Sequence, residues 1–462
     1  MFEATTTDTL ITPTDGMVIR SDVQFKPGIY VLPHGIQIDA DGVTIDGNGA
    51  TLVGSDRQGA AISVDGRAHV AIRNVRIRDY YHGITVRNAK DIIIEANHIT
   101  STDEVEANTA FLDIWRPVET AYGAAILLDH VEGATVNDND IQHQMNGLLT
   151  YHCTKLNVRR NVASYNSGFG IHLYGTCDSV FEQNWADYCN RYEPRDAGEP
   201  VVGVGATGHM GADTTGFLLV YGSCRNVFRR NCARLGGDGF FVAGMTPELE
   251  PVPCNDNLFE ENDVSLSPNI GFEATFCTGN IFRNNWADRC NFGFWLGYSS
   301  RNVLEGNRML YNRQAGIAAE HGVGMEVRNN DFQSNGTGIL LWTKHVDALL
   351  KVMPEHQTVR DWLIEKNKFY RNETGIGILA DKDHGIRPAA EEDSGKAALR
   401  PCDVVIREND IQDNRIGIHL FCADRTVIEK NKINRNVEAD VRREDDRETV
   451  LGHNLGMRGA YL

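Results

Sequence analysis

The sequence has no apolar run long enough to cross a membrane and no excess of basic residues. Its 45 Lys and Arg residues stand against 63 Asp and Glu residues, which gives a formal net charge of −18. A membrane span needs about 20 consecutive apolar residues, and a nucleic-acid partner needs a basic face. We therefore expect neither a membrane nor a nucleic acid as a partner, and the charge also disfavours a polyanionic substrate.

A targeting signal and a cysteine framework are missing as well. The start, MFEATTTDTLITPTDG, has no basic segment followed by an apolar core, so we expect a cytoplasmic protein, or a secreted one if a signal was trimmed. The 10 cysteines form no CxxC pair. Five share one place in the repeat described below: Cys153, Cys177, Cys224, Cys254 and Cys277. A disulfide or metal ladder is one interpretation, but we favour buried thiols in a reducing compartment, with no metal and no cofactor.

What the sequence has in abundance is a repeat. The pattern apolar-x-x-Asn ends at positions 48, 74, 97, 139, 161, 184, 231, 262, 285, 307, 330, 367, 409 and 431, and seven of these thirteen intervals are 22 or 23 residues. Segments such as VFEQN (180–184) and LFEEN (258–262) alternate apolar and polar residues, as strands do. About ten residues after the asparagine comes Gly-(Ile or Phe)-x-apolar, as in GIHLY (170–174) and GFEAT (271–275).

A unit of about 22 residues cannot bury its own apolar face, but stacked units can. Two or three short strands in each unit therefore predict an all-β solenoid, a parallel β-helix of about 14 coils. We interpret the asparagines as a ladder at a turn, because Asn tolerates left-handed backbone angles and its amide can pair with the next coil. We expect one domain over 1–462, with a cap and first coil in 1–40, coils in 41–440, insertions at 102–122, 190–212, 244–254, 343–359 and 381–400, and a second cap in 441–462.

This pattern resembles the pectate-lyase-like right-handed β-helix superfamily over nearly the whole chain. The phrase FKPGIYVLPHGIQIDADGVTIDGNGATLVG (25–54) is similar to the first coils of that superfamily. The resemblance implies a single-stranded right-handed parallel β-helix and a carbohydrate ligand. It does not imply one activity, because this architecture carries lyases, hydrolases, epimerases, transferases and inert spikes. The polygalacturonase signatures and the epimerase motif Asp-Pro-His-Asp are missing, so no catalytic residue is carried over from those branches.

The insertions predict a groove along the Gly-(Ile or Phe) strands. Two of them precede this strand in their coils (102–122 and 190–212), and three follow it (244–254, 343–359 and 381–400), so the strand column forms a floor between walls. Strand alternation points the second and fourth residues after the glycine outward. On or beside these positions lie the candidate substrate-binding residues His172, Tyr174, Phe241, Trp295, Glu320, His321 and Trp342. Aromatic faces suit sugar rings, and packing under the insertions is the alternative for the aromatic residues.

Three acids near this strand in successive coils are the candidate catalytic residues: Asp213, Asp238 and Glu273. Because adjacent coils lie about 4.8 Å apart, we expect the carboxyl groups of Asp238 and Glu273 within about 5–7 Å. Glycosidic bond cleavage uses such a pair, one group protonating the leaving oxygen and the other acting as nucleophile or base. We assign Glu273 as the acid, with Asp238 or Asp213 as its partner. The alternatives are turn roles for the aspartates and a solvated surface position for Glu273.

These residues predict a glycoside hydrolase, or a transferase acting by transglycosylation, whose substrate is a neutral oligo- or polysaccharide. A uronate polysaccharide lyase or C5-epimerase is the first alternative. That chemistry needs a base near C5, and the outward column offers His172 and Tyr174 but no Arg or Lys. The second alternative is a non-catalytic glycan-binding or spike-like protein. A homo-oligomer, as in trimeric β-helices, is compatible with each of these functions.

Overall fold

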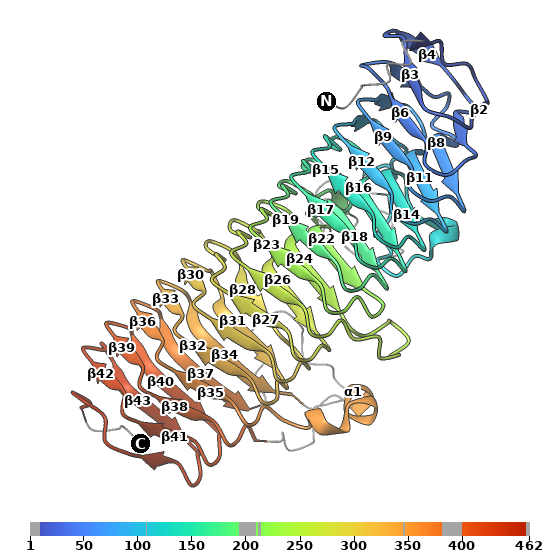
Figure 1. Cartoon of the computed structure of the whole chain (residues 1–462). Coiled ribbons are helices and arrows are strands. Elements are labelled where there is room, and N and C mark those ends of the chain that lie inside the picture. The colour runs from blue at the N-terminus through green and yellow to red at the C-terminus, as the bar shows by residue number, and fades with distance from the viewer. Residues whose placement is uncertain are drawn as a thin grey trace, which may run out of the picture. The chain divides into compact units, whose positions relative to one another are not determined.

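The structure, a computed structural model, describes residues 10–107, 109–193, 209–210, 214–344, 347–380 and 400–458. It is an all-β protein built from stacked coils of parallel strands (Figure 1), which confirms the expected fold class. In the described residues one α-helix is present, α1 (Asp347–Val352), with two short 3-10 turns, η1 (Val118–Thr120) and η2 (Pro354–His356). The chain separates into two compact units, residues 1–218 and 219–462. That these units act as one domain stays a prediction.

In each unit, every coil contributes strands to parallel sheets that we name by their sequence features. The groove sheet contains the strands that begin near the Gly-(Ile or Phe) motif. The asparagine sheet contains the strands that end just before the ladder asparagines. The short-strand sheet contains the three-residue strands that follow the ladder in some coils.

The strands of the first unit are as follows. Its groove sheet contains β2 (Met17–Ile19), β5 (Ile36–Ile38), β8 (Ala60–Asp65), β11 (His82–Arg87), β14 (Ala124–Asp129), β16 (Asn146–Tyr151) and β18 (Ile171–Tyr174). Its asparagine sheet contains β1 (Leu10–Ile11), β3 (Val23–Phe25), β6 (Thr44–Asp46), β9 (Ala71–Arg73), β12 (Ile93–Glu95), β15 (Thr135–Asn137), β17 (Asn157–Arg159) and β19 (Val180–Glu182). The short-strand sheet contains β4 (Ile29–Val31), β7 (Thr51–Val53), β10 (Arg76–Arg78) and β13 (His98–Thr100), and β20 (Tyr192–Glu193) pairs with β21 (His209–Met210) in an antiparallel hairpin.

The second unit repeats this plan, and β22 (Thr215–Val220) contains the boundary between the units. Its groove sheet contains β24 (Asp238–Ala243), β26 (Ile270–Thr275), β28 (Phe292–Trp295), β31 (Ala315–Glu320), β34 (Thr337–Thr343), β37 (Thr374–Ala380), β40 (Ile416–Phe421) and β43 (Ala439–Glu444). Its asparagine sheet contains β23 (Val227–Arg229), β25 (Leu258–Glu260), β27 (Ile281–Arg283), β29 (Val303–Glu305), β32 (Glu326–Arg328), β35 (Leu363–Glu365), β38 (Val405–Arg407), β41 (Val427–Glu429) and β44 (Val450–Leu451). The short-strand sheet contains β30 (Arg308–Leu310), β33 (Asp331–Gln333), β36 (Lys368–Tyr370), β39 (Asp410–Gln412) and β42 (Lys432–Asn434).

The asparagine ladder is present and buried. In the second unit the backbone and side-chain amides of Asn285 both donate to Oδ1 of Asn307, at 2.9 and 3.0 Å. The same pair of bonds joins Asn262 to Asn285 one coil earlier. From Asn97 onward the left-handed backbone angle falls on the residue before the asparagine, as at Glu261 and Asn284. Asn48 and Asn74 are exceptions with left-handed angles of their own, and in the coil of Asn74 the ladder place is taken by Val75, whose N–H donates to Asn97 Oδ1 at 3.1 Å. The predicted ladder is therefore confirmed, while the left-handed residue lies one position earlier in most coils.

Stacked phenylalanines fill the core of the second unit. Phe259 of the asparagine sheet stacks on Phe228 and Phe282, with ring centroids 5.1 and 4.8 Å apart. Phe272 of the groove sheet stacks in the same way between Phe240 and Phe294. These two columns meet edge to face, which is a favourable arrangement for aromatic rings. The inward position of each strand is thereby fixed, and the alternate residues point outward.

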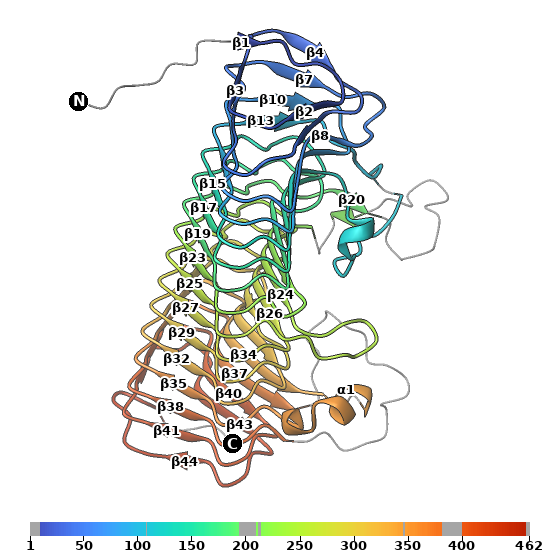
Figure 2. The ribbon, with the colours of Figure 1, turned by 45° about the vertical axis from the view of Figure 1, so that its right-hand side comes forward.

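Three of the predicted insertions are described in full or in large part. The insertion 102–122, which carries η1, belongs to the first unit, and the other two lie beside the groove sheet of the second unit. Residues 244–254 form a loop closed by an antiparallel bridge between Met245 and Pro251. Residues 343–359 carry α1 and η2, and Figure 2 shows α1 standing out from the coils beside β34 and β37. Most of 190–212 and nearly all of 381–400 lie outside the described residues.

Candidate functional site

The outer face of the groove sheet in the second unit carries five of the ten predicted site residues. The register pairs Phe241 with Glu273 and Glu273 with Trp295 at the second position after the glycine. It pairs Glu320 with Trp342 at the fourth position. Because the sheet is parallel and in register, these side chains form two columns along the outer face, as the strand alternation predicts.

The two tryptophans of these columns pack against each other and are not an open platform. Trp295 is 6% exposed and Trp342 is 1% exposed. Their ring centroids lie 5.1 Å apart, and they share a buried cluster with Phe292, Leu340 and other apolar residues of the outer face. Phe241 is buried as well. The structure therefore favours the packing alternative for these aromatic residues, because their side chains are covered.

Asp238 and Glu273 do not face each other. Asp238 is fully buried at the start of β24, and its Oδ1 accepts hydrogen bonds of 2.9 Å from Ile270 N and from Asn269 Nδ2. It stands beside Ile270, whereas Glu273 lies three residues farther along β26, about 10 Å away along the strand. The expected separation of about 5–7 Å is therefore wrong. The bonds of Asp238 fix the turn and strand of the next coil, while Glu273 remains half-buried between Phe241 and Trp295.

Asp213, the third predicted acid, lies outside the described residues.

Glu320 is a second carboxylate on this face, two coils from Glu273. It is 3% exposed, and its Oε1 accepts a hydrogen bond of 3.2 Å from the hydroxyl of Tyr298. Gly297 occupies the corresponding place in the preceding coil and has no side chain to fill the space beside Glu320. Two coils and two residues separate the α-carbons of Glu273 and Glu320, which amounts to about 12 Å. Because Glu320 reaches back toward Tyr298, its carboxylate lies closer to the coil of Glu273 than its α-carbon does.

His321, predicted to help form a sugar subsite, instead fixes the insertion 343–359. Its ring is fully buried and stacks on Tyr298 at 4.8 Å. Nδ1 lies 2.7 Å from the carbonyl of His356, and Nε2 contacts both the backbone N–H of Lys344, at 3.0 Å, and the carbonyl of Lys344. His356 in turn donates from Nδ1 to the carbonyl of His321 at 2.9 Å. Both nitrogens of His321 are thus used by the backbone of the insertion, and a substrate role for this residue is not supported.

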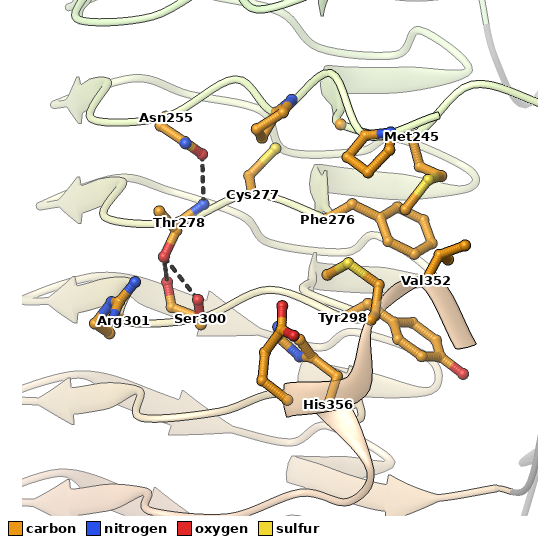
Figure 3. A pocket seen from close by; sticks show the side chains of 15 residues that line it. Met245, Asn255, Phe276, Cys277, Thr278, Tyr298, Ser300, Arg301, Val352 and His356 are labelled. Carbon is orange, nitrogen blue, oxygen red and sulfur yellow. Dashed lines mark hydrogen bonds and ion pairs between the residues drawn. The ribbon is translucent and has the colours of Figure 1, made fainter. Parts of the chain in front are cut away.

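A pocket lies at the end of the groove strands, between the insertions 244–254 and 343–359 (Figure 3). Its volume is about 280 Å³. The insertion 244–254 contributes Met245, and the insertion 343–359 contributes Val352, Met353 and His356. The floor is formed by the turns after β26 and β28, where Phe276 and Tyr298 stack at 5.3 Å. Burial lowers the pKa of His356, so its ring is neutral near pH 7. The predicted walls therefore enclose a cavity, although it lies past the strands rather than over them.

In the first unit, His172 and Tyr174 belong to a packed aromatic cluster. His172 is 2% exposed and lies 5.5 Å from the rings of both Tyr151 and Phe169. Burial lowers the pKa of His172 to about 3, and neither ring nitrogen has a hydrogen-bond partner in the described part of the chain. Tyr174 is buried and lies 5.2 Å from the ring of Tyr151. These residues fill the outer face of this unit, and an open subsite at His172 and Tyr174 is not supported.

Comparison with known families assigns the chain. The model of a family described as the right-handed β-helix region matches residues 27–206, 118–250 and 212–348, which together cover well over half of the chain. The chain belongs to the right-handed β-helix family. This confirms the resemblance drawn from the repeat and the handedness that it implied.

Several solved β-helix structures are similar to this β-helix protein. A mutant of the periplasmic alginate epimerase AlgG has a TM-score of 0.44 and 12% identity, with 93% of this chain and 79% of that chain covered. The DFA-IIIase of Arthrobacter chlorophenolicus A6 has a TM-score of 0.40 and 13% identity, with 68% and 72% covered. The A-module of the Azotobacter vinelandii mannuronan C-5 epimerase AlgE6 has a TM-score of 0.34 and 12% identity, with 96% and 90% covered. A search of curated proteins finds no match. At these sequence identities and TM-scores, the activities of the similar structures cannot be assigned to this chain. The family assignment rests on the family model.

The described coils of this β-helix contain no group of three or more His, Cys, Asp or Glu side chains that could hold a metal ion. All 10 cysteines are free thiols, and burial raises the pKa of Cys153 and of Cys290 to about 12. The interpretation as separate thiols is therefore confirmed, although Cys177 and Cys224 are only half-buried. A search for helices that could span a membrane finds none long and apolar enough among the described residues.

Tyr298, which links the pocket to Glu320, is not among the residues predicted for the site. A signal for it exists in the repeat. Phe276, Tyr298 and His321 follow the outward column at intervals of 22 and 23 residues, and all three have left-handed backbone angles. An aromatic or imidazole ring at the same turn of successive coils predicts a stack along the axis, and Tyr298 stacks on both of its neighbours.

Proposed function

We propose that this β-helix protein is a carbohydrate-active enzyme that cleaves or transfers a glycosidic bond of a neutral oligo- or polysaccharide. Two glutamates on one outer face carry the proposal: Glu273, half-buried between Phe241 and Trp295, and Glu320, buried beside Trp342 and bonded to Tyr298. Glycosidases use two carboxyl groups on either side of the scissile bond, about 6.5–9.5 Å apart in inverting enzymes. The α-carbons of the two glutamates lie about 12 Å apart, and carboxyl groups that lean toward each other over a bound sugar would come within this range.

The environments of the two glutamates suit different roles. Burial of a carboxyl group against indole rings favours its neutral form, as a general acid requires. Glu320 is the more buried of the two and lies next to Trp342 in the register, whereas Glu273 is the more accessible. We therefore assign Glu320 as the acid that protonates the leaving oxygen, and Glu273 as the carboxylate that activates water or a sugar hydroxyl. Relative to the roles expected from the sequence, Glu273 changes from acid to base and Glu320 replaces Asp238 as its partner.

The pocket between the insertions extends this site. The ring of Tyr298 forms part of the pocket floor, and its hydroxyl group donates a hydrogen bond to Glu320. A substrate bound over the glutamates therefore has a recess for one sugar at the end of the groove strands. The mixture of apolar walls and a few polar groups in this recess is typical of small-ligand sites.

The test is turnover of a panel of neutral glycans, followed by release of reducing sugar or by a change in chain length. Glu320→Gln and Glu273→Gln are each expected to lower kcat by about 10²–10⁴-fold, the contribution of a positioned acid or base, with unchanged thermal unfolding. Glu326→Gln is the matched control, because Glu326 lies on the asparagine sheet. Full activity in either of the first two variants would remove that residue from the mechanism.

The same panel separates the alternatives. Turnover of uronate polymers alone, with formation of an unsaturated product, would replace this proposal by an elimination. The structure gives that alternative less support, because His172 is buried and Tyr174 is packed against Tyr151. Binding of a glycan without turnover would favour the non-catalytic role. The ten free thiols support function in a reducing compartment.

A further inference from the structure

An exposed tryptophan stands on the second unit, away from the groove sheet. Trp286 directly follows the ladder residue Asn285 and pairs through backbone bridges with Asp263 in the preceding coil and with Arg308 in the following one. Its side chain is 40% exposed, although its chain neighbours Asn285 and Ala287 are buried. Tryptophan is highly buried on average, so the surroundings of this exposed indole are of interest.

The indole forms one wall of a hollow of about 420 Å³. Cys232 and Asp263 occupy the place of Trp286 in the two preceding coils, as the bridges between them show. Their side chains are much shorter than an indole, so the space beside the ring on that side stays open. The remaining walls are Arg230, Glu261, Ser265, Asp288 and Arg308, with Asn231 at the base.

The polar walls are held in place by ion pairs. Arg308 lies 2.6 Å from Asp288, whose Oδ1 also accepts from the backbone N–H of Leu310. Asp263 accepts from the backbone N–H of Ser265 at 3.0 Å, and Arg230 lies 3.8 Å from Glu261. The hollow therefore offers fixed carboxylate acceptors and guanidinium donors next to an aromatic face.

We propose that this hollow is a second glycan-binding site, with Trp286 as its platform and a neutral polysaccharide as its ligand. A pyranose or furanose ring presents an apolar C–H face that packs on an indole, and hydroxyl groups that bind carboxylates and guanidinium groups at its edge. Two arginines and three carboxylates line the hollow, which leaves one net negative charge. This balance disfavours a uronate polymer and favours an uncharged one.

The site is distinct from the proposed catalytic face. Arg308, next to Trp286, begins β30 of the short-strand sheet, whereas Glu273 and Glu320 lie on the groove sheet. A polysaccharide held at Trp286 does not occupy the glutamates, so the hollow acts as an anchoring site. The choice of a carbohydrate ligand agrees with the proposed function, but the binding itself needs no turnover.

Affinity electrophoresis tests the proposal with the whole chain, using gels that contain arabinoxylan, galactomannan, β-glucan, inulin or, as anionic probes, alginate and polygalacturonate. We expect at least one neutral polysaccharide to retard the wild-type protein. Trp286→Ala is expected to raise the apparent Kd for it about 10-fold or more, as loss of a central aromatic contact does, while Trp286→Tyr keeps part of the affinity. Tyr311→Ala is the matched control, because Tyr311 is an exposed aromatic residue of the same unit outside the hollow.

The outcomes also separate this inference from the proposed function. Lost retardation of Trp286→Ala with unchanged kcat/KM on a short oligosaccharide supports an anchoring site, and lost retardation supports binding even if no glycan is turned over. Equal retardation of Trp286→Ala and the wild type would overturn the proposal. So would retardation by the anionic probes alone, by none of the probes, or a loss of short-oligosaccharide turnover in Trp286→Ala.

Discussion

Removal of one ladder asparagine in the middle of the second unit is expected to destabilise that unit by about 4 kcal/mol. The side chain of Asn285 takes part in four hydrogen bonds: two donated by its Nδ2 to Asn307 Oδ1 and Phe259 O, and two accepted by its Oδ1 from Asn262. All four are buried. A hydrogen bond contributes about 1 kcal/mol net, and a buried partner left unsatisfied costs about 1–3 kcal/mol. Asn285→Ala removes all four hydrogen bonds and is therefore expected to lower the free energy of unfolding by about 4 kcal/mol, without any added cost for buried partners left unsatisfied.

This loss is a large part of the about 5–15 kcal/mol that stabilises an ordinary protein. The assay is urea unfolding followed by tryptophan fluorescence and by circular dichroism, so that separate unfolding of the two units is detected as two transitions. Asn291→Ala is the matched control, since Asn291 makes an exposed side-chain hydrogen bond with Arg313 in the same unit. A loss below about 1 kcal/mol for Asn285→Ala, equal to that of the control, would refute the view that the ladder holds the coils together.

Three further outcomes follow from the core and its titratable groups. Phe259→Ala is expected to cost about 3–5 kcal/mol in urea unfolding, because it opens the stack between Phe228 and Phe282, and Phe259→Leu should cost much less. His172 has a pKa of about 3 in the folded protein, compared with an ordinary value of 6.5. As pH decreases, the unfolded chain therefore takes up this proton before the folded protein does, and stability falls from pH 6.5 toward pH 3. His172→Leu should reduce this loss of stability by about 2 kcal/mol between pH 7 and pH 5. Thiol titration should label at most the four half-buried cysteines in the native protein and all 10 in guanidinium, and fast labelling of Cys290 would contradict its burial.

The coil architecture could be predicted because it depends on the spacing of residues within and between neighbouring coils. Each coil repeats an apolar alternation, an asparagine and a glycine-headed strand, and the stack follows since no coil buries its apolar face alone. The ladder through Asn262, Asn285 and Asn307 could be anticipated for the same reason, because residues at a constant interval in a solenoid lie above one another. The sequence also located the walls formed by 244–254 and 343–359.

The positions of residues along the strand direction were harder to predict. Asp238 and Glu273 lie in adjacent coils, and coil number alone suggested that their carboxyl groups meet. The register shows that three residues separate them along the strand, which is about twice the distance between coils. A solenoid repeat fixes height along the axis, but the position within a coil must be read from the glycine of each strand. Asp238 directly precedes the glycine of its strand, as Ile270 does in the next coil, so Asp238 belongs to the column of Ile270.

The burial of outward-facing aromatic residues could not be predicted either. Alternation correctly places Trp295 and Trp342 on the outer face, yet both are covered. Whether an outer face is open depends on the packing of insertions, and these have no repeat that would reveal their course. The same holds for His321, whose ring is bound by Lys344 and His356 from the insertion. Trp286 shows the converse, because its exposure comes from short side chains in the neighbouring coils.

Gly297 offers a test of where the catalytic face lies. A methyl group at this position would meet its nearest neighbours, Trp295 Nε1 and the backbone oxygen of Glu320, at 3.6 and 3.8 Å, which are ordinary contacts. Gly297→Ala should therefore fold with unchanged or slightly higher stability, since alanine reduces the freedom of the unfolded chain by about 0.4–1 kcal/mol. Gly297→Leu fills the space between the indole and the side chain of Glu320. If Glu320 is the acid, a displacement of its carboxylate by about 1 Å lowers kcat about 100-fold, whereas polysaccharide retardation through Trp286 is unchanged. Full turnover in a folded Gly297→Leu protein would place the chemistry elsewhere on the coils.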